Sequence, residues 1–225
     1  MHKTGQVLRP VPIEEVSRKV LHILVVVFPV LIFYSPITLG ISKDIVFKVV
    51  TFLLIYAFAT EYLRLNHNPF RKWFNKYLGF MLRESESHSL TGGVYVVAAL
   101  FICSGLNLIS DQMSASCFLG FTLFIIGDGA AALVGKSMGR TKIGDKTLEG
   151  ALGCFLICFF IAFLLFPYLP EFEELWEREL TLFNAAFLSL SVAVLELFPL
   201  KIKNFILNDN LYVPVIVSVL AVVLP

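Results

Sequence analysis

The sequence predicts an all-α fold, a polytopic transmembrane helical bundle of about seven spans with a cytoplasmic N-terminus. Three observations indicate this class: the composition, the length of the apolar runs and the distribution of positive charge. Of the 225 residues, 57% are hydrophobic and only 16% are charged, and the mean hydropathy is +0.81. Soluble domains carry about 25% charged residues, so the composition excludes an ordinary water-soluble domain.

The apolar residues gather in runs of about 20, the length that an α-helix needs to cross a bilayer. The predicted spans are Val20–Leu39, Ile45–Leu63, Leu90–Ile109, Met113–Val134, Leu148–Phe166, Thr181–Leu200 and Leu211–Leu224. The last run is short, which leaves open whether it crosses fully. The first run is too long for the apolar core of a signal peptide and lacks a small-residue cleavage site, so we expect it to be a span.

No linker, low-complexity segment or clear repeat divides the chain, so we interpret residues 1–225 as a single integral-membrane domain. The four cysteines all lie in apolar runs without the paired spacing of a metal site, which predicts small buried hydrophobic residues. The net charge of +1 gives no indication of a nucleic-acid partner.

Positive charge predicts the orientation. With a cytoplasmic N-terminus and alternating spans, most of the 18 lysines and arginines fall on the inner side, as the positive-inside rule requires. The outer segment between the fifth and sixth spans is acidic instead. Polar residues at the ends of the spans also gather on the inner side, which favours a site that faces the cytosol. A transporter would more often place them at mid-depth and on both sides.

Asp128 lies inside the fourth apolar run, and an ionisable residue at membrane depth usually serves an ion, a proton or a substrate. A glycine-rich segment with four cations follows it: Lys136, Arg140, Lys142 and Lys146. One carboxylate can hold Mg²⁺ while the metal bridges phosphates. The next span begins near Thr147 and Glu149, and a helix N-terminus offers N–H groups to an anion. The segment predicts a phosphate ligand, although a helix–helix hydrogen bond of Asp128 and simple anchoring by the cations stay open.

Two familiar phosphate motifs are excluded. Five residues separate Gly129 from Gly135 where a P-loop needs four, and the segment follows a membrane helix rather than a strand. The spacing of Gly127 and Gly129 is that of a dinucleotide-binding turn, but no βαβ unit surrounds it. Gly135 and Gly139 have the spacing of a helix-packing face, although their polar surroundings favour a loop.

Other polar residues accompany these runs. Glu61 and Arg64 can pair on one helix face, either as structure or in contact with substrate. His22 is a candidate proton acceptor or phosphate partner, or else a hydrogen-bonded interfacial residue. Asp209 and Asn210 precede the last run, where they could cap a helix or contact ribose or metal.

Taken together, these elements resemble the CTP-dependent lipid-alcohol kinases, which include dolichol kinase, phytol kinase and the yeast-type diacylglycerol kinase. The central match is Gly127-Asp128-x-x-Ala-Ala-x-x-Gly135-x-x-x-Gly139-Arg140 followed by Lys146-Thr147-x-Glu149-Gly150. The flanking matches, in the expected order, are Arg18-Lys19-x-x-His22, Glu61-x-x-Arg64, His88-x-x-Thr91-Gly92 and Asp209-Asn210-x-x-x-Pro214. Ala151 departs from the serine often found at its position.

The resemblance implies a kinase that uses CTP and Mg²⁺ to phosphorylate the hydroxyl of a membrane lipid alcohol of the dolichol or polyprenol, phytol or diacylglycerol class. It implies Asp128 and Glu149 as metal ligands, and His22 or Glu61 as the group that orients the hydroxyl. The implied nucleotide-binding residues are Gly127, Gly135, Gly139, Arg140, Lys142, Lys146, Thr147, Gly150, Asp209 and Asn210. The expected location is a bacterial inner membrane or an ER-type membrane, with the site facing the cytoplasm.

Two alternatives remain. Phosphatidate cytidylyltransferase, which makes CDP-diacylglycerol, shares the Gly-Asp and Lys-Thr-x-Glu-Gly core. Its C-terminal Pro-Gly-x-Gly-Gly and acidic cluster are absent from this sequence, which favours the kinase. A membrane transporter without nucleotide turnover is the second alternative.

Overall fold

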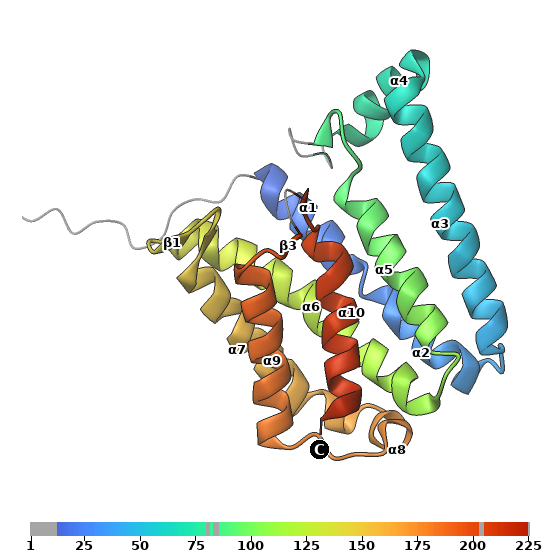
Figure 1. The fold of residues 1–225 in the computed structure, drawn as a ribbon, viewed down its shortest axis with the longest axis vertical. Helices are drawn as coiled ribbons and strands as arrows, with labels where there is room; N and C mark the ends of the chain where they lie inside the picture. The colour runs from blue at the N-terminus through green and yellow to red at the C-terminus, as the bar shows by residue number, and fades with distance from the viewer. Residues whose placement is uncertain (1–12, 80–81, 83–85, 203–204, 225) are drawn as a thin grey trace, which may run out of the picture.

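The computed structural model describes residues 13–79, 82, 86–202 and 205–224, and it is a bundle of helices (Figure 1). The helices are α1 (Ile13–Leu24), α2 (Val27–Thr38), α3 (Lys43–Asn66), α4 (Asn68–Leu78), α5 (Gly92–Leu106), α6 (Asp111–Met138), α7 (Leu148–Leu164), η3 (Phe166–Tyr168), α8 (Phe172–Trp176), α9 (Leu182–Leu197) and α10 (Asp209–Val223). Two short antiparallel hairpins join β1 (Lys142–Ile143) to β2 (Lys146–Thr147) and β3 (Lys201–Ile202) to β4 (Phe205–Ile206).

Each predicted apolar run is helical over most of its length. Four segments of the described chain are long and apolar enough to cross a membrane: Val16–Thr38, Lys43–Asn66, Asp111–Met138 and Leu148–Tyr168. The helices α5, α9 and α10 are apolar but shorter. The helical, membrane-type class is therefore confirmed, whereas the number of spans and the orientation of the N-terminus stay predictions.

The first predicted span is broken into α1 and α2. The break precedes Pro29, which has no N–H to donate to the carbonyl group of Val25. Hydrogen bonds of the i to i−3 type replace the helical pattern there, from Val25 N to His22 O and from Val26 N to Ile23 O. Pro29 is visible in the sequence, but the continuous apolar run predicted a single unbroken span.

Helix α6 occupies the centre of the bundle, where it packs most extensively on α7 and α10 and also contacts α1, α2, α5 and α9 (Figure 1). Small residues allow its neighbours to come close. A Cβ atom on Gly127 would lie 2.8 Å from the sulfur atoms of both Cys154 and Cys158 on α7, and one on Gly120 would lie 2.6 Å from the backbone N of Ser218 on α10. Such small residues are typical of close helix packing in membranes. All four cysteines are free and buried, as predicted.

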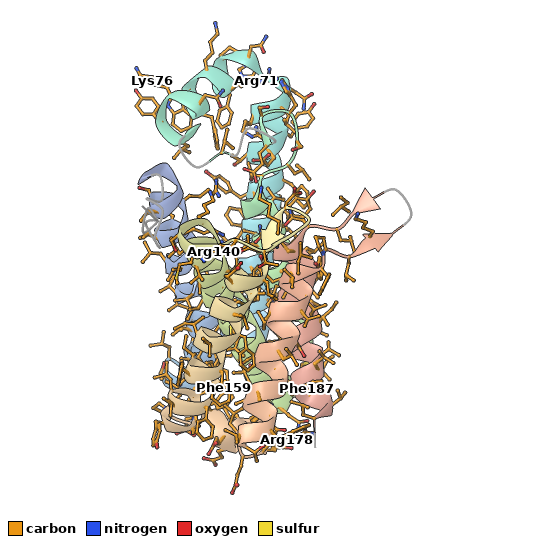
Figure 2. All side chains as sticks on the ribbon, turned by 90° about the vertical axis from the view of Figure 1, so that its left-hand side faces the viewer. Arg71, Lys76, Arg140, Phe159, Arg178 and Phe187 are labelled. Carbon is orange, nitrogen blue, oxygen red and sulfur yellow. The ribbon has the colours of Figure 1, made fainter. Side chains whose placement is uncertain are left out.

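The acidic segment between α7 and α9 is folded rather than a simple loop. Phe172 and Trp176 of α8 are fully buried, and Trp176 Nε1 donates a hydrogen bond of 3.0 Å to Ser116 Oγ on α6. Arg178 lies at this end of the molecule, whereas Arg71, Lys76 and Arg140 lie toward the other end (Figure 2). The helix α8 therefore closes the bundle at the end that is remote from the basic segment.

Candidate active site

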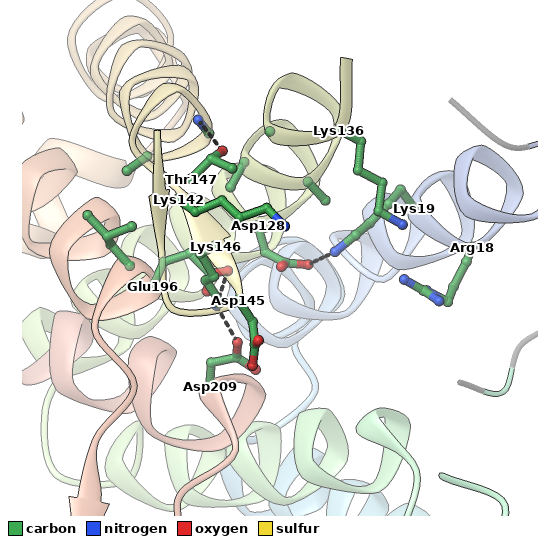
Figure 3. Close-up of a pocket in the computed structure, with 16 residues that line it drawn as sticks. Arg18, Lys19, Asp128, Lys136, Lys142, Asp145, Lys146, Thr147, Glu196 and Asp209 are labelled. Carbon is green, nitrogen blue, oxygen red and sulfur yellow. Dashed lines mark hydrogen bonds and ion pairs between the residues drawn. The ribbon is translucent and has the colours of Figure 1, made fainter. Parts of the chain in front are cut away.

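A cavity of about 340 Å³ lies where α1, α6, α7, the β1–β2 hairpin, α9 and the start of α10 meet (Figure 3). Its volume is at the lower end of the range for small-molecule sites, about 300–1,000 Å³. The charged residues that line it are Arg18, Lys19, Asp128, Lys136, Lys142, Asp145, Lys146, Glu196 and Asp209. Acids and bases from segments far apart in the sequence therefore face a single space.

Asp128 is held by two basic residues of α1. Its Oδ2 lies 2.5 Å from Lys19 Nζ and 3.3 Å from His22 Nε2. Asp128 is only 8% exposed and Lys19 only 3% exposed, so the carboxylate and the ammonium group are buried together. Lys19 and His22 are three residues apart and share one face of α1. A buried charge is tolerated when it is paired in this way, and α1 supplies both partners of the Asp128 carboxylate.

Lys146 connects the hairpin to two further helices. Its Nζ is bonded to Glu196 of α9 and lies 2.7 Å from Asp209 Oδ2 of α10 (Figure 3). Burial alone would lower the pKa of Lys146, but these two carboxylates raise it well above its ordinary value. Lys146 is therefore positively charged at neutral pH. Glu196 is 4% exposed, and its second oxygen, Oε2, has no hydrogen-bond partner among the described residues.

The hairpin brings both of its lysines to the cavity. Lys142 pairs with Thr147 and Ile143 with Lys146, and Gly144 in the turn has a φ of +62°, a conformation that favours glycine. Thr147 is the N-cap of α7, because its Oγ1 accepts a hydrogen bond of 3.1 Å from Gly150 N. The cavity therefore lies beside a helix N-terminus, as predicted for an anion site.

The glycines of the motif allow close packing around this cavity. A Cβ atom on Gly135 would lie 2.8 Å from Thr147 Oγ1, and one on Gly150 would lie 2.7 Å from Ala131 O. Gly139 is packed against Gly135 O and the side chain of Thr147. Because α6 continues to Met138, the predicted loop around Gly135 is wrong and the helix-packing interpretation holds. Gly135 and Gly150 also line the cavity, whereas Gly127 and Gly139 do not.

The predicted site residues Glu149 and Arg140 also lie outside the cavity. Both carboxylate oxygens of Glu149 accept hydrogen bonds from Thr141 N, at 3.1 and 3.2 Å, so this side chain secures the start of the hairpin. Arg140 is exposed and does not line the cavity. The structure therefore does not bring Glu149 to Asp128 as the predicted pair of metal ligands.

Glu61 is part of a separate network. It is paired with Arg64 at 2.6 Å and accepts a hydrogen bond of 3.1 Å from Thr91 Oγ1. Arg64 also donates to the carbonyl oxygens of Glu86 and Ser89. This buried network ties α3 to the start of α5, and Glu61 lines neither of the cavities that contain Asp128.

A second cavity of about 290 Å³ adjoins the first and shares Arg18, Lys19 and Asp128 with it. His22 and Asn210 line this second cavity. The amide of Asn210 donates to Gly92 O at 3.5 Å, which links α10 to α5. The Lys19–Asp128 pair is therefore a partition between two cavities.

Sequence reasoning assigned no role to four charged residues that line the first cavity: Arg18, Lys19, Asp145 and Glu196. Glu196 carried a usable signal, because it is an acid in an apolar run just as Asp128 is. Lys19 also carried a usable signal, because it belongs to the matched motif Arg18-Lys19-x-x-His22 and lies three residues from His22.

The oxygen donors of the first cavity suit Mg²⁺. Asp128, Glu196 and Asp209 all line it, and Glu196 has the unbonded oxygen described above. Among the described residues, no group of three His, Cys, Asp or Glu side chains is close enough to hold a metal ion. Mg²⁺ is commonly held by one or two carboxylates together with substrate phosphates, so this donor set fits a metal that binds together with a nucleotide.

Comparison with known proteins gives several similar chains, including the three that follow. Uncharacterized protein RP860 of Rickettsia prowazekii is 23% identical over 205 residues, which cover 89% of this chain and 89% of that protein. CTP-dependent diacylglycerol kinase 1 of Schizosaccharomyces pombe is 26% identical over 208 residues, which cover 90% and 89%. Phytol kinase 1, chloroplastic, of Arabidopsis thaliana is 30% identical over 140 residues, which cover 59% and 43%. No protein-family model and no solved structure matches the chain.

The similarity to CTP-dependent lipid kinases that the motifs predicted is therefore confirmed, at modest identity. Together with the apolar helices, it identifies the chain as an integral membrane protein.

Proposed function

We propose that this protein is a lipid kinase that transfers the γ-phosphate of CTP to the hydroxyl of a membrane lipid alcohol. The observation that carries the proposal is the cavity in which a buried, cation-paired Asp128 faces a group of lysines beside the N-terminus of α7. The two named kinases that resemble the chain add the nucleotide and the class of acceptor. We place the site on the cytoplasmic face of a bacterial inner membrane or an ER-type membrane, within one domain formed by residues 1–225.

Phosphoryl transfer depends mainly on positioning and on neutralising charge. We assign Lys142 and Lys146 to the phosphates of CTP, because both reach the cavity from the hairpin. Lys136 and Arg18 line the same cavity and would add positive charge at its border. The backbone N–H groups at the start of α7 would supply donors to the same phosphates.

Mg²⁺, when bound, would neutralise charge on the transferring phosphates, and Asp128 together with Glu196 would hold it. His22 is the candidate group to take the proton from the lipid hydroxyl. It lines the second cavity, and its Nε2 lies 3.3 Å from Asp128 Oδ2. Glu61 is the weaker candidate, because its carboxylate already binds Arg64 and Thr91.

The proposal is tested with purified protein in detergent, Mg²⁺ and CTP labelled at the γ-phosphate. The acceptors are a panel of dolichol, a shorter polyprenol, phytol and diacylglycerol, with labelled ATP in a parallel series. We expect a labelled phospholipid from at least one acceptor and CDP as the nucleotide product. Pyrophosphate and CDP-diacylglycerol from phosphatidate would instead indicate a cytidylyltransferase. If no acceptor is labelled by CTP, the proposal is wrong.

Glu149→Gln tests whether Glu149 is a metal ligand. Because its carboxylate is bonded to Thr141 N outside the cavity, we expect the Mg²⁺ concentration that gives half-maximal turnover to be unchanged. The maximal rate should fall only severalfold, because the variant loosens the hairpin that carries Lys142 and Lys146. The measurement is a Mg²⁺ titration of turnover at saturating CTP. A requirement for much more Mg²⁺ in the variant would restore Glu149 as a ligand.

A further inference from the structure

We propose that the chain of the acceptor lipid lies in an apolar groove between α2, α3 and α5, with its hydroxyl in the second cavity beside Asp128 and His22. This inference rests on the proposed lipid kinase function and adds to it the place where the lipid binds. The groove has a volume of about 590 Å³ and is lined almost entirely by apolar side chains. Along α3 it extends from Ile45 to Glu61, which corresponds to about 24 Å at the helical rise per residue.

The walls of the groove open toward the surroundings. Helix α3 stands at the side of the bundle and packs mainly on α5 and α4 (Figure 1). It contacts α2 only weakly, and both Leu31 of α2 and Val49 of α3 line the groove while being 54% exposed. In a membrane, such a surface faces lipid chains. An apolar chain can therefore reach the groove sideways without passing through water.

The groove continues into the second cavity. Six residues line both spaces: Phe28, Phe74, Thr91, Gly93, Val97 and Leu100. The second cavity in turn shares Lys19 and Asp128 with the candidate nucleotide cavity. The lining therefore changes from apolar in the groove, to mixed in the second cavity, to charged in the nucleotide cavity. A long apolar chain with one hydroxyl at its end matches this order of polarity.

A second apolar groove, between α7 and α9, is the competing location. It has a volume of about 500 Å³ and touches the nucleotide cavity at Ala151 and Leu197. It shares no residue with the second cavity, and neither Asp128 nor His22 lines it. A lipid in that groove would meet the nucleotide cavity away from the proposed proton acceptor, which favours the groove between α2, α3 and α5.

Gly93 provides a sharp test. It lines both the groove and the second cavity, and a Cβ atom on it would meet only Thr91 Oγ1, at an ordinary 3.7 Å. Gly93→Phe would therefore fill the passage without an immediate backbone clash. Gly93→Ala adds one methyl group and should improve the helix slightly. Ala186→Phe places the same ring in the competing groove and is the matched control.

Two measurements are made on the full-length protein in detergent. In the first, the KM values for CTP and for the lipid alcohol phosphorylated in the panel are compared between variants of equal thermal stability. We expect Gly93→Phe to raise the lipid KM about tenfold or more with the CTP KM unchanged, because only lipid binding is lost. Ala186→Phe should resemble the unmodified protein, and Gly93→Ala should change the lipid KM far less than Gly93→Phe does. A raised lipid KM in Ala186→Phe with none in Gly93→Phe would overturn the inference.

The second measurement needs no turnover. A diacylglycerol with a photoreactive diazirine on one acyl chain is crosslinked to the protein, and the labelled peptides are identified by mass spectrometry. We expect labels on α2, α3 and α5 that decrease in Gly93→Phe. Labels confined to α7 and α9 would contradict the groove. If the labels fall as expected while CTP labels no lipid, the kinase proposal fails and the groove stands as a lipid site.

Discussion

Asp128→Asn is expected to lower the turnover of the folded protein by roughly 100- to 1,000-fold, a loss of the size seen when one electrostatic group is removed from an active site. The carboxylate lies at the partition between the two cavities, where it would hold Mg²⁺ and orient His22. Asparagine has the same size, and its carbonyl oxygen can still accept a hydrogen bond from Lys19. The side-chain volume is therefore kept, but the buried ammonium group of Lys19 loses its counter-ion, so the variant should also lose some thermal stability.

The measurement is the initial rate with γ-labelled CTP and the preferred lipid alcohol, together with the thermal unfolding of the variant in detergent. Glu149→Gln is the control, because it removes one carboxylate charge outside the cavity and keeps the size of the side chain. Turnover of Asp128→Asn within about tenfold of the unmodified protein would exclude Asp128 from the reaction, since loss of a charge-stabilising contact costs more than that. An unfolding temperature that stays well above the assay temperature would assign the lost turnover to chemistry rather than to unfolding.

The class of fold could be predicted from sequence because it depends on composition and on the length of apolar runs. Each apolar run is mostly helical, and the cysteines are buried packing residues, because both outcomes follow from local apolarity. The break before Pro29 and the short helix α8 were missed. At the break, a proline within a long apolar run ends the first helix. In α8, two aromatic residues within an acidic segment are buried and fold it into a helix.

The candidate site could be predicted only in part, because a motif gives the identity of a residue and not its direction. Asp128 and Lys146 lie in one cavity as expected. Glu149 is two residues beyond Thr147, in the first turn of α7, where its side chain turns back to Thr141 N instead of facing the cavity. Lys19 pairs with Asp128, and Glu196 pairs with Lys146. The members of each pair are distant in the sequence, so tertiary packing is needed to show that they meet.

The second large effect is expected on thermal stability, when the buried ion pair of Glu61 and Arg64 is broken. Arg64 is 1% exposed and Glu61 is 3% exposed, and Arg64 also donates to the backbone between α4 and α5. Arg64→Met leaves the carboxylate of Glu61 buried without its cation. Breaking a buried pair in this way costs about 3–5 kcal/mol, so we expect a large drop in thermal stability. The measurement is the unfolding temperature in detergent at fixed lipid content.

The double variant Glu61→Met/Arg64→Met separates structure from chemistry. Replacing both members of a buried ion pair by apolar residues of similar size is often close to neutral, so much of the lost stability should return. Because Glu61 lines the end of the lipid groove but neither cavity that contains Asp128, the folded double variant should keep its CTP KM and a measurable turnover, with any change confined to the lipid KM. A double variant that regains stability but remains inactive would show that Glu61, and not His22 alone, acts on the lipid hydroxyl. The buried pair would then have to serve the reaction as well as the packing of α3 on α5.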